Sequence, residues 1–79
     1  MITWLRLWVF LDENDDVESL IDISRRSKIS YPCVLDGIRL LESMSIINVV
    51  VEKNKRTVVK TQKWLETRDQ FLSIVRGMQ

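Results

Sequence analysis

The sequence predicts a mostly helical α+β fold, with three helices before a β-hairpin and one helix after it. Apolar residues recur at helical spacing in four segments, and two β-branched runs, at 46–52 and 57–60, are separated by a short polar loop. The chain has 79 residues, of which 46% are hydrophobic and 29% charged, as is usual for a folded domain. We therefore expect residues 1–79 to form a single domain.

The residue inventory argues against an enzyme. The chain has one cysteine and no histidine, which excludes most zinc sites, the Ser-His-Asp triad and the Cys-His dyad. An acidic cluster precedes the second helix, but it lacks the spacing of a calcium loop, so we interpret it as a solvated turn (Asp12, Glu13, Asp15 and Asp16). No catalytic residue, metal or cofactor is expected.

The first helix, at residues 2–11, is apolar on most of its sides. Trp4, Leu7, Trp8 and Leu11 share one face, while Leu5 lies on another. A run of about ten residues is too short to span a bilayer, so we expect no membrane contact and a cytoplasmic location. Because a chain this short has few residues to cover such a helix, a second subunit is the expected cover.

The next two helices are marked at their starts. The acids at 12–16 suit the N-terminus of a helix at about 17–25, which places Val17, Leu20 and Ile21 on one face. A third helix is expected to begin with Ser30 as N-cap and Pro32 in its first turn. Its inward positions recur at i, i+4 and i+7 (Val34, Ile38 and Leu41). Gly37 inside it either admits a close neighbour or is simply tolerated.

The second half of the chain predicts a hairpin and a last helix. Strands at 46–52 and 57–60 flank the polar loop 53–56, and the helix at about 62–77 again carries a wide apolar stripe. We expect residues 1–11 and 62–78 to form a dimer interface. Its contact residues would be Trp4, Leu5, Trp8, Val9, Trp64, Phe71, Leu72 and Val75.

Charge is sorted along the chain although its net value is only +1. Residues 1–24 contain one basic and six acidic residues, whereas residues 25–63 contain nine basic and three acidic ones. This pattern predicts a basic face that meets an anionic partner.

The stretch from Ile29 to Ile47 resembles the second and third helices of the winged helix-turn-helix family as they run into the wing. A Ser-capped helix carries apolar residues at i, i+4 and i+7, then a Leu-Glu pair, a turn and an Ile-Ile strand start. Small dimeric regulators of the MarR, ArsR and PadR type and many archaeal and viral regulators share this order. The resemblance implies a helix-turn-helix at 17–44 and a wing at 46–60. One departure is Ser45, where the family usually has glycine.

The resemblance implies a homodimeric regulator that binds double-stranded DNA, most simply a nucleoid-associated transcriptional repressor. The third helix would enter the major groove, with Arg39 on a guanine, and the loop 53–56 would reach phosphates. The implied DNA-binding residues are Arg25, Arg26, Lys28, Ser30, Tyr31, Pro32, Cys33, Leu35, Asp36, Arg39, Lys53, Asn54, Lys55 and Arg56.

Alternative interpretations remain open at this point. Asp36 and Leu35 on the outer face of the third helix suit a protein-interaction module better than a DNA reader. Plasmid or viral partition and copy control would use the same fold. Cys33 could act in redox sensing beside Tyr31, although a small, partly buried thiol is the simpler interpretation. The three tryptophans fit core or dimer packing better than base stacking.

Overall fold

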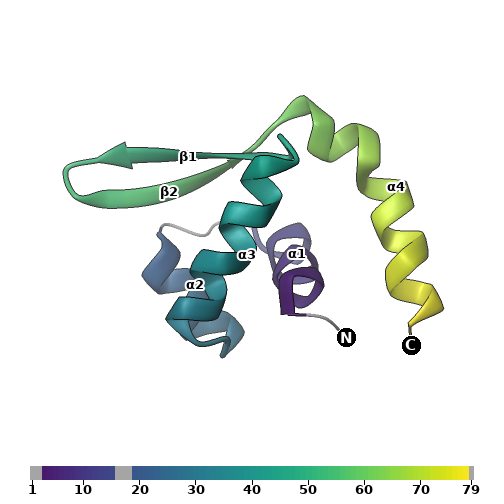
Figure 1. Cartoon of the computed structure of the whole chain (residues 1–79), viewed down its shortest axis with the longest axis horizontal. Helices are drawn as coiled ribbons and strands as arrows, with labels where there is room; N and C mark the ends of the chain where they lie inside the picture. The colour runs from purple at the N-terminus through teal and green to yellow at the C-terminus, as the bar shows by residue number, and fades with distance from the viewer. Residues whose placement is uncertain (1–2, 16–18, 79) are drawn as a thin grey trace.

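The computed structural model describes residues 3–15 and 19–78, and within them it contains four helices and one two-stranded sheet (Figure 1). The helices are α1 (Thr3–Glu13), α2 (Leu20–Ser27), α3 (Tyr31–Ser43) and α4 (Gln62–Gly77). The strands β1 (Ile47–Glu52) and β2 (Lys55–Lys60) form an antiparallel hairpin between α3 and α4. The predicted order of elements and the mostly helical α+β class are confirmed.

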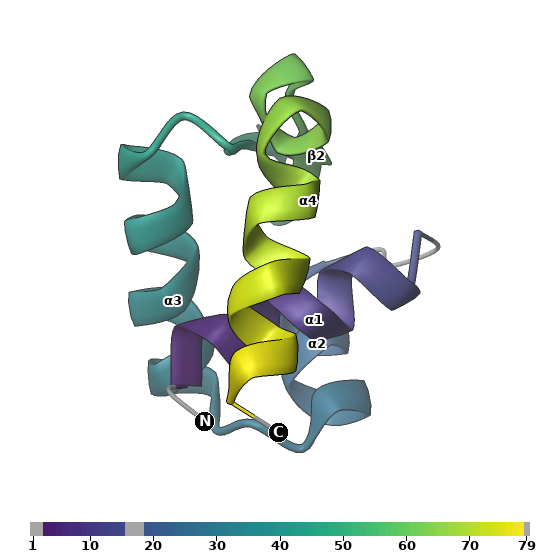
Figure 2. The ribbon, with the colours of Figure 1, turned by 90° about the vertical axis from the view of Figure 1, so that its right-hand side faces the viewer.

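Helix α1 lies between α3 and α4 (Figures 1 and 2). On the α3 side the backbones approach closely at Gly37, where an added Cβ would lie 2.6 Å from Leu7 Cδ2 and 3.6 Å from Trp4 Cα. Of the two alternatives that the sequence left open, a close neighbour is therefore favoured, because Leu7 would have to move to admit a side chain at Gly37. Leu5, Leu7, Trp8 and Leu11 of α1 are all buried within the single chain.

Four aromatic side chains fill the space between α1 and α4, and we call them the aromatic cluster (Trp4, Trp8, Trp64 and Phe71). The Trp8 and Trp64 rings stack with centroids 5.1 Å apart, and the Trp4 ring meets Phe71 edge-on at 6.0 Å. Trp8 and Trp64 are among the largest fully buried side chains. Full burial of a large apolar side chain contributes about 1.5–3 kcal/mol, so this cluster is a principal source of stability.

Helix α2 begins later than the acidic run suggests. Ser19 is its N-cap, and the Ser19 hydroxyl accepts a hydrogen bond of 3.1 Å from the backbone N–H of Asp22. The predicted start at Val17 lies outside the described residues. Leu20 and Ile23 face the core, whereas Ile21 is 61% exposed. The prediction that Ile21 faces inward was therefore wrong. Leu20 and Ile23, three residues apart, form the buried face of this short helix, and Ile21 lies outside that face.

The connection from α2 to α3 is a tight turn held by serine side chains. Lys28 ends α2 with a left-handed backbone, φ 63°. The Ser24 hydroxyl donates to the carbonyl of Ile29 at 2.6 Å, and the Ser27 hydroxyl accepts from the N–H of Ile29 at 3.2 Å. Helix α3 then begins after Ser30, with Pro32 in its first turn, and buries Val34, Ile38 and Leu41 as predicted.

Helix α3 ends in a Schellman-type turn that has serine where glycine is usual. The N–H of Ile46 donates to the carbonyl of Leu41 and the N–H of Ser45 to that of Glu42, at 3.2 and 2.9 Å. Ser45 adopts φ 61°, the left-handed conformation that glycine tolerates best. Ser45 therefore occupies the left-handed position of this turn, where glycine is usual, and the turn still makes both of its hydrogen bonds.

The hairpin is tighter than the predicted four-residue loop. Glu52 pairs with Lys55, so only Lys53 and Asn54 form the turn, and both have positive φ (47° and 68°), as a type I′ turn requires. Alternation along the paired strands gives two faces. The inner face packs toward the helices and consists of Ile47, Val49, Val51, Arg56, Val58 and Lys60.

Candidate nucleic-acid interface

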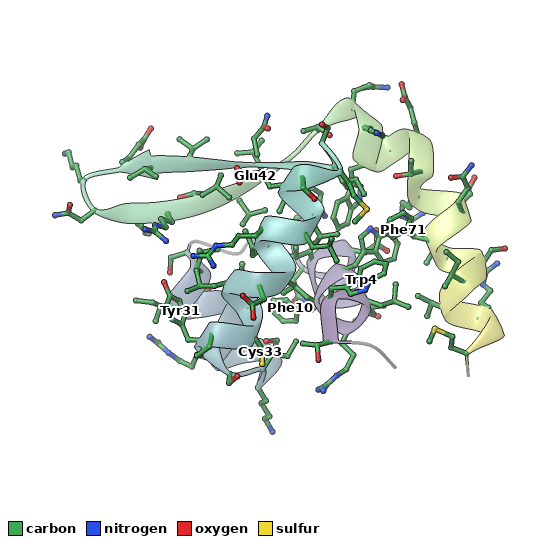
Figure 3. All side chains as sticks on the ribbon, viewed as in Figure 1. Trp4, Phe10, Tyr31, Cys33, Glu42 and Phe71 are labelled. Carbon is green, nitrogen blue, oxygen red and sulfur yellow. The ribbon has the colours of Figure 1, made fainter. Side chains whose placement is uncertain are left out.

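The hairpin extends over α2 and α3, and its tip, residues 53–56, projects past α2 (Figures 1 and 3). A hollow of about 510 Å³ lies between the tip and α3. Tyr31 from α3 lines one side of this hollow, and Asn54 and Arg56 line the other. Two predicted DNA-contacting regions that are more than twenty residues apart in the sequence are thus brought together.

A second hollow, of about 310 Å³, continues the first toward the C-terminal half of α3. The two hollows share Leu20, Leu35 and Arg56, and together we call them the hairpin groove. Arg39 of α3 and Val51 of β1 line its second part. Glu42 lies in the same part, where its carboxylate accepts a hydrogen bond from the backbone N–H of Val49 at 3.3 Å. Glu42 thereby attaches α3 to the outer edge of β1.

The outward surface of α3 is exposed but carries little net charge. Pro32, Cys33, Asp36 and Arg39 are exposed, and Leu35 is half-buried against the hairpin. The Arg39 guanidinium lies 3.9 Å from the Asp36 carboxylate, with side chains 73% and 81% exposed, so this pair is weak. Cys33 is an exposed free thiol, which corrects the expectation of a partly buried one. Ser30 is exposed and its side chain makes no capping hydrogen bond.

The three cations at the end of α2 differ in their surroundings. Arg25 follows Ile21 by four residues, so both lie on the flank that lines the hairpin groove. Lys28 comes directly after this helix and is exposed. Arg26 instead engages the end of α1: its guanidinium lies 3.2 Å from the Asn14 side-chain oxygen, 3.4 Å from Asp22 and over the Phe10 ring.

At the α1–α4 side, two N-terminal acids pair with cations that are distant in the sequence. Lys60 Nζ lies 2.6 Å from the Asp15 carboxylate and 4.9 Å from the Trp64 ring centre. Arg68 makes two hydrogen bonds to Asp12, at 2.8 and 3.2 Å. These hydrogen bonds, followed by the charge of Asp12, raise the pKa of the Arg68 guanidinium. Asp12 and Asp15 thus neutralise these two cations.

Half of the residues predicted for the dimer interface lie inside the chain. Leu5, Trp8, Trp64 and Val75 are buried, because α3 and α4 cover α1 without a second subunit. The remaining predicted residues are half-buried (Trp4, Val9, Phe71 and Leu72). Large apolar side chains that are exposed on α4 and at its C-cap are Leu65, Ile74 and Met78, none of which belongs to the predicted interface.

Two residues of the hairpin groove were also missed in the sequence, Ile21 and Val51. The alternation of Ile47, Val49 and Val51 places Val51 on the inner face once the hairpin register is known, but that register depends on the two-residue turn. The outward position of Ile21 depends on the start of α2 at Ser19. Neither feature is fixed by the apolar pattern alone.

Comparisons with protein-family models, with curated proteins and with solved structures gave no match to this chain. Within residues 3–15 and 19–78, every helix is too short or too polar to cross a bilayer. In the same residues, no three His, Cys, Asp or Glu side chains form a group that could hold a metal ion.

Proposed function

We propose that this chain is a winged helix-turn-helix protein that binds double-stranded DNA through α3 and the hairpin. The observation that supports the proposal best is the hollow between the hairpin tip and α3, which both Arg56 and Tyr31 line. In this arrangement α3 would enter the major groove, and the tip would contact the flanking phosphates.

Exposed cations of α2, of its C-cap and of the hairpin tip support phosphate binding. Arg25, Lys28, Lys53 and Arg56 are exposed, and none of them has an ion-pair partner within the described part of the chain. Each phosphate neutralised by such a side chain releases a counterion, so binding would weaken steeply as salt rises.

Base recognition would come from the exposed surface of α3. Tyr31, Pro32 and Cys33 are exposed there, and Arg39 is the only cation within the helix. The long, exposed contact of Arg39 with Asp36 can be exchanged at small cost for a bidentate contact with guanine. A protein with one such arginine would show modest sequence preference.

We further propose that the protein acts as a homodimer and, most simply, as a transcriptional repressor that occludes a promoter. The exposed Leu65, Ile74 and Met78 of α4, rather than the buried residues of α1, are the contacts that a second copy would cover. Partition or copy control of a plasmid or viral genome would require the same DNA contacts.

A protein-interaction module is the second candidate, and one observation favours it. The exposed surface of α3 carries Asp36 and Glu42 as well as Arg39, and acidic side chains repel phosphate but suit a protein partner with mixed charge. In this case the hairpin tip would not contribute to DNA affinity.

Charge reversal at the hairpin tip tests the proposal. We expect Lys53→Glu with Arg56→Glu to weaken binding of a random-sequence duplex about a hundredfold or more at low salt, because two phosphate contacts become repulsive. The matched control is Lys63→Glu with Arg76→Glu, two exposed cations on α4, which should change the affinity less than threefold. Fluorescence anisotropy of a labelled duplex measures both.

Equal loss in both variants would mean that only net charge matters and would contradict the proposed interface. Absence of duplex binding by the unmodified protein at low salt would contradict DNA binding itself and favour the protein-interaction module.

A further inference from the structure

Exposed apolar side chains from three separate elements converge on the hairpin groove. Ile21 of α2 is 61% exposed, Val51 of β1 is 64% exposed and Tyr31 of α3 is 37% exposed. Ile21 and Tyr31 line the first hollow and Val51 lines the second. The half-buried Leu35 lines both. Exposed apolar residues scattered over a surface are ordinary, but a group that lines one concave surface indicates a ligand or partner.

The charges around this apolar surface are arranged for an anion. Arg56 extends from the inner face of β2 and lines both hollows, and Arg39 lines the second hollow from α3. The Glu42 carboxylate is hydrogen-bonded to the backbone N–H of Val49. Within the described residues, the Arg56 guanidinium has no ion-pair partner. A guanidinium beside apolar side chains suits a carboxylate or sulfonate, which it can bind through two parallel hydrogen bonds.

The volume of the groove suits a small ligand. Its two hollows have volumes of about 510 and 310 Å³, within the range of roughly 300–1,000 Å³ found for small-molecule sites.

We infer that the hairpin groove binds a small amphipathic organic anion. Its apolar body would cover Ile21, Leu35 and Val51, and its anionic group would pair with Arg56, with Arg39 as the second cation. The ligand would contact the hairpin and α3 together and would compete with DNA for Arg56 and Tyr31. Binding of the ligand itself does not depend on the proposed DNA binding.

The test uses the full chain without DNA and two fluorescent probes. 8-Anilinonaphthalene-1-sulfonate combines an aromatic body with one sulfonate, and N-phenyl-1-naphthylamine is its uncharged analogue. We expect saturable, one-to-one binding of the sulfonate by the unmodified protein. Arg56→Gln should weaken sulfonate binding about tenfold and change binding of the uncharged probe less than twofold. Val51→Ser should weaken binding of both probes about fivefold.

Matched controls lie on α4. Leu65 has the same 64% exposure as Val51, and Arg76 is an exposed arginine like Arg56. Leu65→Ser and Arg76→Gln should leave the affinity for both probes within twofold of the unmodified protein. Circular dichroism and thermal unfolding of each variant establish that the fold is retained.

Three results would overturn the inference. They are absence of saturable sulfonate binding, equal loss of binding in the α4 variants, and sulfonate binding that Arg56→Gln does not weaken. Light scattering adds a fourth: if the protein self-associates and Val51→Ser abolishes this, the groove binds a second copy instead. DNA binding enters none of these measurements, so a failure here is distinct from a failure of the proposed function.

Discussion

The two sides of α1 and α3 use the same kinds of residues in opposite ways. On the side of α4, large aromatic side chains are buried against one another, and two cations are paired, Lys60 with Asp15 and Arg68 with Asp12. On the side of the hairpin, Val51 and Ile21 are exposed, and Arg56 has no ion-pair partner among the described residues. The first side supplies stability, whereas the second leaves side chains available for a partner.

This difference predicts that substitutions on the two sides differ sharply in their effect on stability, and the largest effect is expected at Trp8. Trp8→Ala removes a fully buried ring that stacks on Trp64 and should lower the free energy of unfolding by about 3–5 kcal/mol. Val51→Ala should change it by less than about 0.5 kcal/mol. Urea unfolding followed by circular dichroism measures both free energies. Similar losses in the two variants would contradict the difference between the α4 side and the hairpin side.

Gly37 tests the close approach of α1 and α3. Gly37→Leu adds a Cβ that would lie 2.6 Å from Cδ2 of the fully buried Leu7. Leu7 must then move and the core around it must repack, so we expect a loss of about 2 kcal/mol or more. Gly77→Leu is the control, because nothing lies within 4 Å of the added Cβ. Thermal unfolding that shifted equally in the two variants would show that the effect arises from helix propensity instead.

Ser45 tests the turn between α3 and the hairpin. Because a left-handed backbone costs a non-glycine residue about 1–2 kcal/mol, and glycine adds entropy to the unfolded chain, Ser45→Gly should stabilise the protein by about 0.5–1 kcal/mol. Ser45→Ala keeps the cost of φ 61° and should not stabilise. Chemical denaturation distinguishes the two, and stabilisation by alanine would argue for an effect of the side chain.

The smallest effect is expected at Lys60. Lys60→Gln removes the contacts with Asp15 and Trp64, but Asp15 is largely exposed, so the loss should be about 0.5 kcal/mol and should shrink in high salt. Lys63→Gln, next to Trp64, should have no measurable effect. A loss at Lys60 that persisted at 1 M salt would show that packing, not charge, holds this side chain.

Local signals in the sequence predicted much of the fold. Pro32 and the spacing of Val34, Ile38 and Leu41 defined α3 correctly, because a helix start and an inward stripe depend only on nearby residues. The limits of α4 were also correct. The start of α2 was not, because several acids and Ser19 could all begin a helix, and only packing of Leu20 and Ile23 selects among them.

The candidate site depended on long-range contacts, so less of it was predictable. The sequence identified the residues of the hairpin tip but not that they line one hollow with Tyr31. That arrangement depends on how the hairpin packs over α2. The sequence also indicated a strongly basic middle region, whereas Lys60 is paired with an acid 45 residues away. Charge sorted along a chain predicts a charged surface only where folding does not bring the opposite charges together.

The salt dependence of duplex affinity is the most direct test of the proposed binding to double-stranded DNA. A labelled random-sequence duplex would be titrated with the protein at roughly 50 and 200 mM salt, with light scattering on the same sample. We expect binding by a dimer whose affinity falls by orders of magnitude between the two salt concentrations, as several phosphate contacts require. No binding at the lower concentration, or binding that salt does not change, would contradict it.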